Sequence, residues 1–294
     1  MSVLGINRRM FSAVRGVLWV AAVSGMVTAT ATAQTARSAS AQGSTLSIGM
    51  VQVPGGTFEM GSCLTATARD VFLGQACPDP DYDAKLSETP QHAVTVKPFQ
   101  ISKTEITLGQ FKKFIVATGR MDLVDDEFMR YNNQGDNAPV VRVSWNDAQA
   151  FVQWLNRIDG SGWRLPTEAE WEYACRAGGT SRFCSGSDDI AQSAWSSDNS
   201  NGRHHTVALK LPNAWGIHDM AGNVWEWVQD CWTDSYVGAP TNGSAVDGGQ
   251  CAMRVLRGGA WTSPIWEIRA ATRGANTPTY RGNHFGFRVA RSGS

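Results

Sequence analysis

The sequence predicts an exported α+β domain that is rich in loops and has little regular secondary structure. The chain of 294 residues contains 12 Trp and 30 Gly, a balance typical of loops held in place by large indole side chains. Alternating apolar residues follow early in the chain, and two capped helical segments lie near its middle. The 26 basic and 26 acidic side chains cancel, so charge gives no reason to expect binding to nucleic acid.

The N-terminus has the layout of a signal peptide over residues 1–33. Arg8 and Arg9 precede an uncharged apolar run that includes Val17–Val23, and Ala31–Ala33 offers a small-residue cleavage site. The arginine pair also fits a twin-arginine signal, so both export routes remain open. The mature protein is therefore expected to be periplasmic or secreted, with no membrane association after cleavage.

The composition divides the rest of the chain into two parts. Residues 34–48 are rich in Ser, Ala, Thr and Gln, which predicts a flexible linker. Residues 49–292 show no further linker and no internal repeat, which predicts a single folded domain.

The six cysteines all follow the predicted cleavage site. An even number in an exported protein indicates disulfides rather than a metal site, and no zinc-type spacing is present. The simplest pairing is local, with each bridge closing a loop rich in Gly and Asp, although six cysteines allow fifteen connectivities. The predicted pairs are Cys63–Cys77, Cys175–Cys184 and Cys231–Cys251.

The sequence pattern in the first half of the domain predicts four strands and a helix. Val51–Met60 alternates around a Pro-Gly-Gly turn and predicts a hairpin. Pro90–Val96 and Phe99–Ile106 predict a second β pair, and Thr107–Ile115 changes to helical spacing.

Two later helices carry start signals. Ser144 and Asp147 form a capping-box pattern that is followed by apolar residues at helical spacing. Pro166–Glu170 contains a second capping-box pattern, Thr167 with Glu170, and opens a helix that should stop at Gly178-Gly179. After residue 180 the pattern predicts short strands, long loops and no further long helix.

Several blocks along the domain resemble the formylglycine-generating enzyme, or sulfatase-modifying factor, family. The tail carries two of them, Arg254–Trp261 and Gly286–Ala290. In family order they follow Pro54–Ser62, Lys103–Thr107, Val143–Trp145, Trp163–Ala174, Asn213–Gly216 and Asp219–Trp227. The resemblance implies the α+β, C-type-lectin-like fold of that family, and the chain is similar to its periplasmic pyoverdine-maturation branch.

The resemblance also implies that the family's copper chemistry is absent. The copper-dependent enzymes bind Cu(I) through two cysteines in this tail, whereas no cysteine follows Cys251 here. Ser263 stands near the place of the first cysteine, the second has no counterpart, and Ala260 replaces the family's substrate-side serine. A serine hydroxyl cannot replace a thiolate for Cu(I). Copper is therefore not expected, and whether the protein is an enzyme stays open.

The Asp219–Trp227 block implies a structural calcium site. Its ligands would be the Asp219 and Glu226 carboxylates and the Gly222 and Val224 carbonyls, which are hard oxygen donors of the kind Ca²⁺ prefers. The alternative is a capped turn in which the two carboxylates accept hydrogen bonds from backbone amides.

The resemblance places a ligand pocket on the tail, and its candidate residues are aromatic, polar or basic. They are Trp225, Trp261, Ser263, Trp266, Glu267, Arg269, Arg273 and His284. For the arginines, together with Arg257 and Arg288, the alternative is a buried structural role that bridges carbonyls and carboxylates. The remaining histidines are scattered along the chain and are interpreted as surface residues.

Three functions follow from these features. The first is a copper-independent family member that binds or modifies a small-molecule or protein ligand, including a siderophore-maturation-like oxidoreductase role. The second is a non-catalytic lectin-type binding module like the variable proteins of diversity-generating retroelements. The third is a regulatory partner subunit.

Overall fold

The folded domain begins earlier than the sequence predicts. The computed structural model describes residues 46–64, 81–160, 162–187 and 189–292. Leu46 is buried in the core and the Ser47 carbonyl accepts a hydrogen bond from Gln110, so these residues belong to the domain and not to the predicted 34–48 linker. No helix in the described residues is long and apolar enough to cross a membrane. The predicted signal peptide lies outside the described residues.

The two predicted hairpins are one long, bent antiparallel pair. Strand β1 (Met50–Val53) pairs with β4 (Phe99–Ser102), and β2 (Gly56–Met60) pairs with β3 (His92–Val96). The register Val53↔Phe99 continues as Gly56↔Val96, so one ladder runs through the bend. The sequence prediction of a β1–β2 turn and a β3–β4 pair is therefore wrong.

Prolines cause the bend in this ladder. Pro54 and Pro98 stand on opposite strands at the interruption, and neither has an N–H to donate. A Cβ at Gly55 would lie 2.8 Å from Cδ of Pro98, so a glycine is needed where the two strands cross. Local alternation cannot reveal this arrangement because the true partner lies about forty residues away in the chain.

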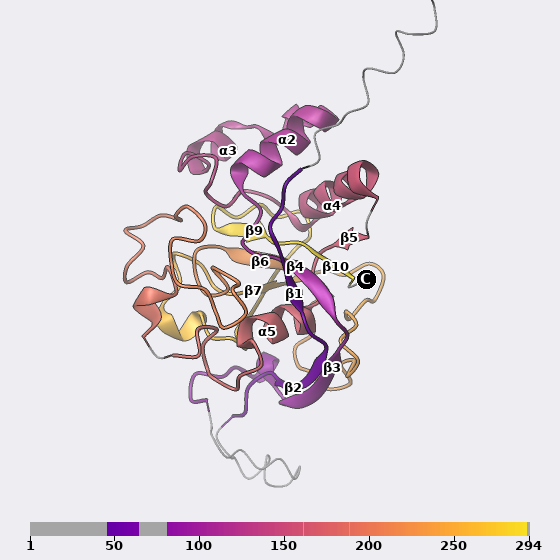
Figure 1. Ribbon diagram of the computed structural model, residues 1–294, viewed down its shortest axis with the longest axis vertical. Helices are drawn as coiled ribbons and strands as arrows, with labels where there is room; N and C mark the ends of the chain where they lie inside the picture. The colour runs from indigo at the N-terminus through magenta and orange to yellow at the C-terminus, as the bar shows by residue number, and fades with distance from the viewer. Residues whose placement is uncertain (1–45, 65–80, 161, 188, 293–294) are drawn as a thin grey trace, which may run out of the picture. The chain divides into compact units, whose positions relative to one another are not determined.

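The first sheet has the strand order β1-β4-β10-β5. Strand β10 (Ala290–Ser292) lies between β4 and the short β5 (Trp163–Arg164), and it is antiparallel to both. The C-terminal segment thus joins the two halves of this sheet, as Figure 1 shows near the label C.

Three helices cover one end of the domain (Figure 1). They are α2 (Leu108–Thr118), α3 (Asp126–Tyr131) and α4 (Trp145–Asp159). The capping box of Ser144 and Asp147 is confirmed, and Thr107 and Gln110 form another at the start of α2. The short α3, capped by Asp125, has no counterpart in the sequence prediction.

Helix α5 (Glu168–Arg176) lies within the domain and carries buried acidic residues. Its predicted capping box, Thr167 with Glu170, is confirmed. Glu168 and Glu172 are almost completely buried and pair with arginines from the tail. The helix ends at Ala177 in the left-handed conformation, one residue before the predicted Gly178-Gly179 stop.

The second sheet has the order β8-β7-β6-β9 and separates two apolar clusters. Its strands are β6 (Trp225–Cys231), β7 (Arg254–Arg257), β8 (Arg273–Asn276) and β9 (Phe285–Phe287). Successive residues Val255 and Leu256 of β7 enter different clusters, one on the α5 side and one on the α2–α4 side. Both faces of the sheet are therefore covered.

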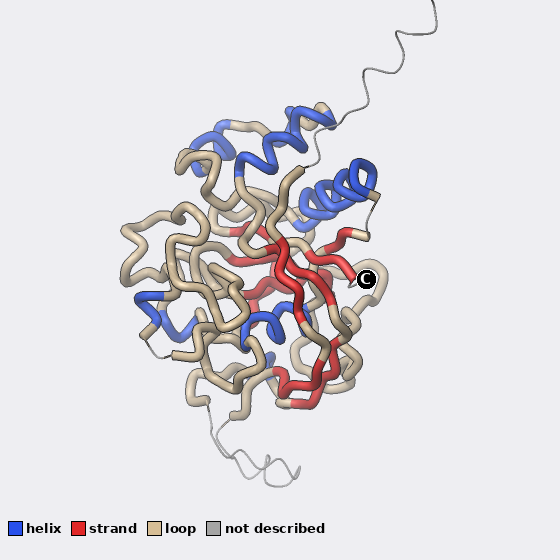
Figure 2. The backbone as a smooth tube through the Cα atoms, in the orientation of Figure 1, coloured by secondary structure: helices blue, strands red, loops and turns tan. Residues whose placement is uncertain are grey.

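The remaining described chain has only single turns of 3-10 helix. These are η1 (Leu86–Glu88), η2 (Met121–Leu123), η3 (Ile190–Gln192) and η4 (Ile265–Glu267). Figure 2 shows how much of this chain runs as loop, which agrees with the composition.

Two of the three predicted disulfides are present in the described residues. Cys175 is bonded to Cys184 and Cys231 to Cys251. Cys63 is also disulfide-bonded, but its predicted partner Cys77 lies outside the described residues. No free thiol occurs in the part of the chain that the structure describes.

Candidate functional site

The loop after β7 places Ser263 in a buried turn. Gly258 and Gly259 both have positive φ, and a Cβ at Gly259 would lie 2.6 Å from Ile268, so this turn folds the loop back tightly. The Ser263 amide donates to the Ala260 carbonyl at 2.8 Å, and its hydroxyl accepts from the Ala260 amide at 3.2 Å. Ser263 is almost completely buried. Its hydroxyl thus holds a turn rather than facing a pocket.

Trp261 joins this turn to the segment around residue 200. Its amide donates to the Asn223 carbonyl and its carbonyl accepts from the hydroxyl of Ser200. The indole Nε1 of Trp261 is buried without a hydrogen-bond partner, as is that of Trp195. Two indole donors of neighbouring segments therefore lack acceptors in the protein.

His205 completes the polar contacts of this segment. Its ring stacks on Trp195 with centroids 3.8 Å apart, and its Nε2 lies 2.7 Å from the Ser200 carbonyl. Its amide donates to the side chain of Asn223. From its sequence context this histidine is interpreted only as a surface residue, yet the structure brings it to the segments that carry Trp225 and Trp261.

His204 is buried, which contradicts its interpretation as a surface residue. Its Nε2 has no hydrogen-bond partner in the protein. Burial, followed by repulsion from His205, lowers the pKa of His204 to about 4 from an ordinary 6.5. The neutral ring is therefore the form that the fold accepts.

We expect this burial to make the protein sensitive to acid. Between pH 6.5 and 4 the unfolded chain protonates His204 and the native state does not, so stability is lost as the pH falls through this window. The loss attributable to His204 is about 2 kcal/mol between pH 7 and pH 5. Urea unfolding at the two pH values measures it, and His204→Gln should remove that part of the pH dependence. An unchanged pH dependence in the variant would contradict the assignment.

The backbones of Trp225 and His284 adjoin where β6 begins, and His284 directly precedes β9. Strands β6 and β9 are parallel here, and the Trp225 amide donates to the His284 carbonyl. The Trp225 ring rests over Gly274 of β8, where a Cβ would lie 3.2 Å from the indole. Both side chains are half-buried, and burial lowers the pKa of His284. The strand partner of Trp225 is Phe285, and the His284 ring contacts that same phenylalanine.

Trp266 and Glu267 lie on η4 and contact a different part of the chain. The Trp266 side chain is 44% exposed, and the Lys85 ammonium lies 5.4 Å from its ring centroid. Lys85 also lies 3.9 Å from the Glu267 carboxylate. These contacts join the tail to the segment before β3.

Arg269 and Arg273 are core arginines, which favours the alternative to ligand binding. Arg269 forms two hydrogen bonds of 2.8 Å with Glu88 and one of 2.6 Å with Asp81. Arg273 is paired with Glu168. Both guanidinium groups are buried and their donors are used within the protein. Sequence spacing could not show this because the acidic partners lie about a hundred residues or more away.

Two of the predicted calcium ligands, the Asp219 and Glu226 carboxylates, are buried and repel each other. Asp219 and Gly222 have positive φ, and the Asp219 carboxylate accepts from the Ala208 amide. The Glu226 carboxylate accepts two hydrogen bonds of 2.7 Å from Arg288 and one from the Trp171 indole. The Oε1 atom of Glu226 accepts only one of these three hydrogen bonds, so it retains a lone pair for a further partner.

Sequence reasoning missed Glu105, a third carboxylate in this cluster. One of its oxygens accepts from Asn223, and the other is buried without a partner. Burial, then repulsion from Asp219 and Glu226, raises the pKa of Glu105 well above its ordinary value. Three carboxylates thus face one guanidinium, that of Arg288. These buried acidic groups outnumber their one cationic partner and leave one oxygen unpaired, but their oxygens do not all lie within 4.8 Å of one another, the spacing needed to share one ion.

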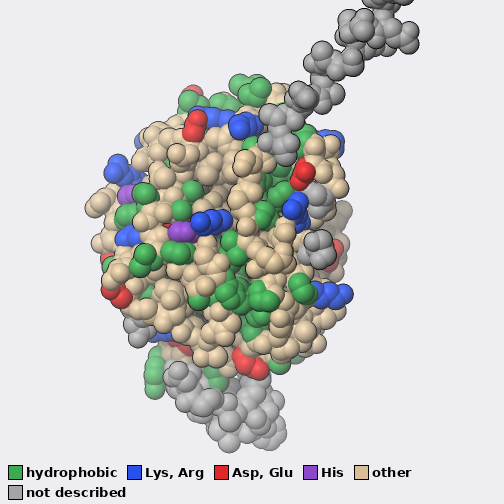
Figure 3. Space-filling view, in the orientation of Figure 1, with side chains coloured by type: hydrophobic (Ala, Val, Ile, Leu, Met, Phe, Trp, Pro, Cys, Tyr) green, Lys and Arg blue, Asp and Glu red, His purple; other side chains and the backbone are tan. Residues whose placement is uncertain are grey.

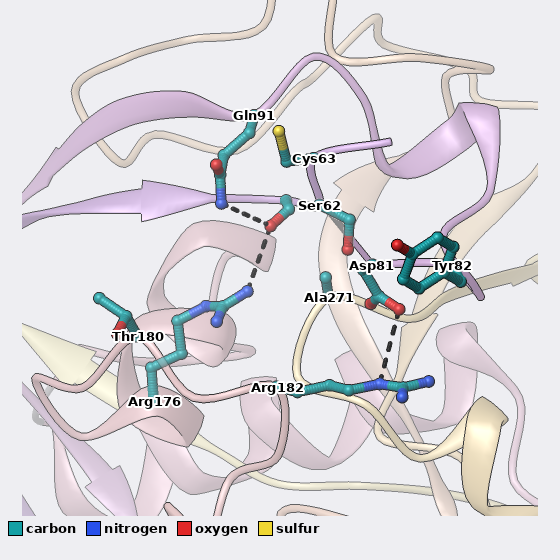
Figure 4. A pocket seen from close by; sticks show the side chains of 10 residues that line it. Ser62, Cys63, Asp81, Tyr82, Gln91, Arg176, Thr180, Arg182 and Ala271 are labelled. Carbon is teal, nitrogen blue, oxygen red and sulfur yellow. Dashed lines mark hydrogen bonds and ion pairs between the residues drawn. The ribbon is translucent and has the colours of Figure 1, made fainter. Parts of the chain in front are cut away.

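A separate cavity of about 310 Å³ lies beside the first strands. Figure 4 shows Gln91 and Arg176 both directed at one carbonyl oxygen, which belongs to Gly61, and Arg182 directed at Asp81. The charged side chains on this wall are therefore already paired. None of the eight predicted pocket residues lines this cavity.

The comparisons agree with the architecture. Residues 35–293 match the family described as sulfatase-modifying factor enzyme 1-like domain. The chain is 32% identical to the formylglycine-generating enzyme of Streptomyces coelicolor, over 82% of this chain and 88% of that protein.

Two solved structures share the fold. PvdO from Pseudomonas aeruginosa is 35% identical and superposes with a TM-score of 0.72, over 83% of this chain and 94% of that one. Treponema denticola variable protein 1 is 22% identical with a TM-score of 0.67, over 83% and 95% of the two chains, which shows a common fold alone. The predicted C-type-lectin-like fold is confirmed, and the chain belongs to the formylglycine-generating enzyme, or sulfatase-modifying factor, family.

Proposed function

We propose that this protein is an exported, copper-independent member of the family that binds a ligand beside Trp225, Trp261 and His284. The observation that carries the proposal is the buried Ser263 turn. Its hydroxyl is hydrogen-bonded to the Ala260 amide at the position where the resemblance expects a thiolate. No free thiol lies elsewhere in the described residues, which supports the proposal that a Cu(I) site of the family type is absent.

Polar atoms without partners support ligand binding near this place. The indole nitrogens of Trp195 and Trp261 are buried donors without acceptors, and His204 Nε2 is also unpaired. Such atoms are costly unless a ligand or water completes them. Trp225 and His284 add half-buried aromatic faces. A ligand with aromatic or planar groups and hydrogen-bond acceptors would suit this mixture.

The likeness to PvdO suggests one such ligand class, a siderophore with a planar chromophore. A role in siderophore maturation follows from that likeness, with oxidoreductase chemistry included only if the ligand is turned over. Disulfides and the predicted signal peptide support a periplasmic or secreted location.

We propose in addition that calcium occupies the carboxylate cluster. Asp219, Glu226 and the carbonyls of Gly222 and Val224 would hold the ion. The oxygens of Asp219, Glu226 and Glu105 do not all lie within 4.8 Å of one another, so Glu105 is not assigned as a ligand. Bound calcium would neutralise this buried charge and fasten the loops that carry Trp195 and Trp225. Its role would be structural.

A lectin-type binding module is the second candidate, because two large aromatic side chains of the tail are exposed. They are Trp266 and Tyr280, with 44% and 49% of their surfaces accessible. Ligand binding at this exposed surface would not involve the buried polar atoms of Trp195, Trp261 and His204 that lack hydrogen-bond partners. A regulatory subunit would use the same exposed residues.

A two-part experiment tests the proposal. First, Cu(I) titration against a chromogenic chelator and mass spectrometry of a sulfatase peptide should show neither copper retention nor formylglycine. Copper binding or product would contradict copper independence.

In the second part, pyoverdine is titrated by calorimetry against the wild type, Trp261→Ala and Trp266→Ala. Binding beside Trp261 predicts at least a tenfold weaker affinity, about 1.4 kcal/mol, for Trp261→Ala alone. Loss confined to Trp266→Ala would support the outer, lectin-type surface. Absence of pyoverdine binding to the wild type would reject the siderophore class.

A further inference from the structure

The Cys231–Cys251 disulfide lines a surface cavity. None of the eight predicted pocket residues lines this cavity. The cavity measures about 390 Å³, and its wall includes Trp232, Met253 and both cysteines. Cys231 is buried at the end of β6, with 7% of its surface exposed, whereas Cys251 is more accessible. The Cys175–Cys184 bridge differs, since its cysteines are 0% and 5% exposed. One described disulfide can be reached from solvent and the other cannot.

The two sulfurs of the accessible disulfide have different surroundings. The Gly248 amide donates to Cys231 Sγ at 3.3 Å, and the Arg254 guanidinium lies 3.7 Å from the same atom. Among the described residues no hydrogen bond reaches Cys251 Sγ. Because positive charge and N–H donors stabilise a thiolate, Cys231 is the better leaving group of the pair.

Arg254 is held where it can act on Cys231. Its guanidinium stacks on Trp145 at 3.9 Å, and its Nη1 donates to the Gln229 carbonyl at 2.8 Å. The side chain is buried apart from a small part of its surface. Its charge therefore stays beside Cys231 without a change of rotamer.

We propose that Cys251 is a thiol-exchange site at which an external thiol attaches while Cys231 leaves as a thiolate. The attacking thiolate forms a bond to Cys251 Sγ, the bond between the two cysteine sulfurs breaks, and its electron pair goes to Cys231 Sγ. The external thiol supplies the reducing electrons and remains as a mixed disulfide. A second thiol releases it and leaves both cysteines reduced.

The carboxylate of Asp247 sets the charge of the preferred thiol. One of its oxygens lies within 4.8 Å of both sulfur atoms. It repels anionic thiols on approach and attracts cationic ones. The cavity thus favours a thiol that carries a positive group or a hydrophobic group able to rest on Trp232.

The fold around the disulfide does not depend on this bond alone. The Cys231 amide donates to the Val246 carbonyl, and the Val246 amide donates to Asp230 at 2.8 Å. Further along the loop, the Thr241 and Gly243 carbonyls accept hydrogen bonds from Thr95 and Thr167. The mixed disulfide can therefore form in the folded protein.

Thiol exchange on the folded, mature protein tests the proposal. The protein is treated with cysteamine or glutathione, quenched by alkylation, and its peptides are analysed by mass spectrometry. We expect the mixed disulfide to form on Cys251 and not on Cys231. It should form several-fold faster with cysteamine than with glutathione. The Cys175–Cys184 bridge should stay intact. Attachment to Cys231, or equal reaction of the two bridges while the near-UV circular dichroism is native, would overturn the proposal.

Two variants separate the contributions of charge. Arg254→Gln should slow thiol exchange about fivefold, because the Cys231 thiolate that leaves is then less stabilised. Arg254→Lys keeps the positive charge and should retain most of the exchange rate. Asp247 is exposed to solvent on the cavity wall. Asp247→Asn should therefore reduce the difference between the exchange rates with cysteamine and with glutathione. If Arg254→Gln does not fold, the Asp247→Asn comparison still decides, and an unchanged selectivity in that variant would overturn the charge argument.

Discussion

Replacing Arg269 by methionine is expected to lower the free energy of unfolding by about 3–5 kcal/mol, because breaking a buried ion pair leaves an uncompensated charge. Glu88 is fully buried and has both carboxylate oxygens on this guanidinium. The Asp81 carboxylate, which lies 2.6 Å from Nη1 of Arg269, also loses its ion pair with this arginine. Urea denaturation followed by tryptophan fluorescence measures the change, with an unaltered m-value as the sign that the native state is intact.

Two controls test the origin of this loss. Arg269→Met combined with Glu88→Gln should recover part of the stability, since the residues contact each other. Arg203→Met, at an exposed arginine, should change stability by no more than about 0.5 kcal/mol. A stable Arg269→Met variant with weakened pyoverdine binding would instead support the ligand-binding role that the tail pattern first suggested.

Calcium removal is expected to have the second large effect. Calcium at a hundredfold excess over its Kd stabilises the native state by about 2.7 kcal/mol, so chelation should lower Tm by several degrees. The cause would be the return of uncompensated charge to Asp219, Glu226 and Glu105. Differential scanning calorimetry with and without a chelator measures the shift, and elemental analysis identifies the ion.

Matched carboxylate variants locate the ion. Asp219→Asn should remove most of the calcium dependence of Tm, whereas Asp198→Asn, at an exposed residue, should leave it unchanged. Equal Tm values in calcium and chelator for the wild type would favour the capped-turn alternative, in which Asp219 serves only the Ala208 amide.

Local patterns predicted the helices well because helix caps are local. The Ser144 and Thr167 capping boxes each involve residues three apart, and both were predicted from sequence. The strand pairing could not be predicted in the same way. The alternation around Pro54 suggests a turn, but whether the chain turns or only bends depends on Pro98, which lies on the strand that pairs with it.

The candidate site was predictable in its residues but not in their environments. The backbones of Trp225 and His284 adjoin at the second sheet, whereas their role in ligand binding stays a prediction. Arg269 could not be distinguished from a ligand-binding arginine, since Glu88 is remote in sequence. Glu105 and His204 were missed because burial decides their importance. Glu105 stands in the Lys103–Thr107 block, but nothing in that block predicts that its carboxylate is buried beside Asp219 and Glu226.

The late position of β10 has a consequence for how the protein is made. Ala290 pairs with Ile101 on one side and Arg164 on the other, so the first sheet lacks an inner strand until nearly the whole chain is available. The two export routes that the N-terminus leaves open would therefore differ in what they carry. Threading from the N-terminus would move an unfinished domain, whose cysteines reach an oxidising compartment before this sheet closes. Twin-arginine export would need the sheet to be complete first.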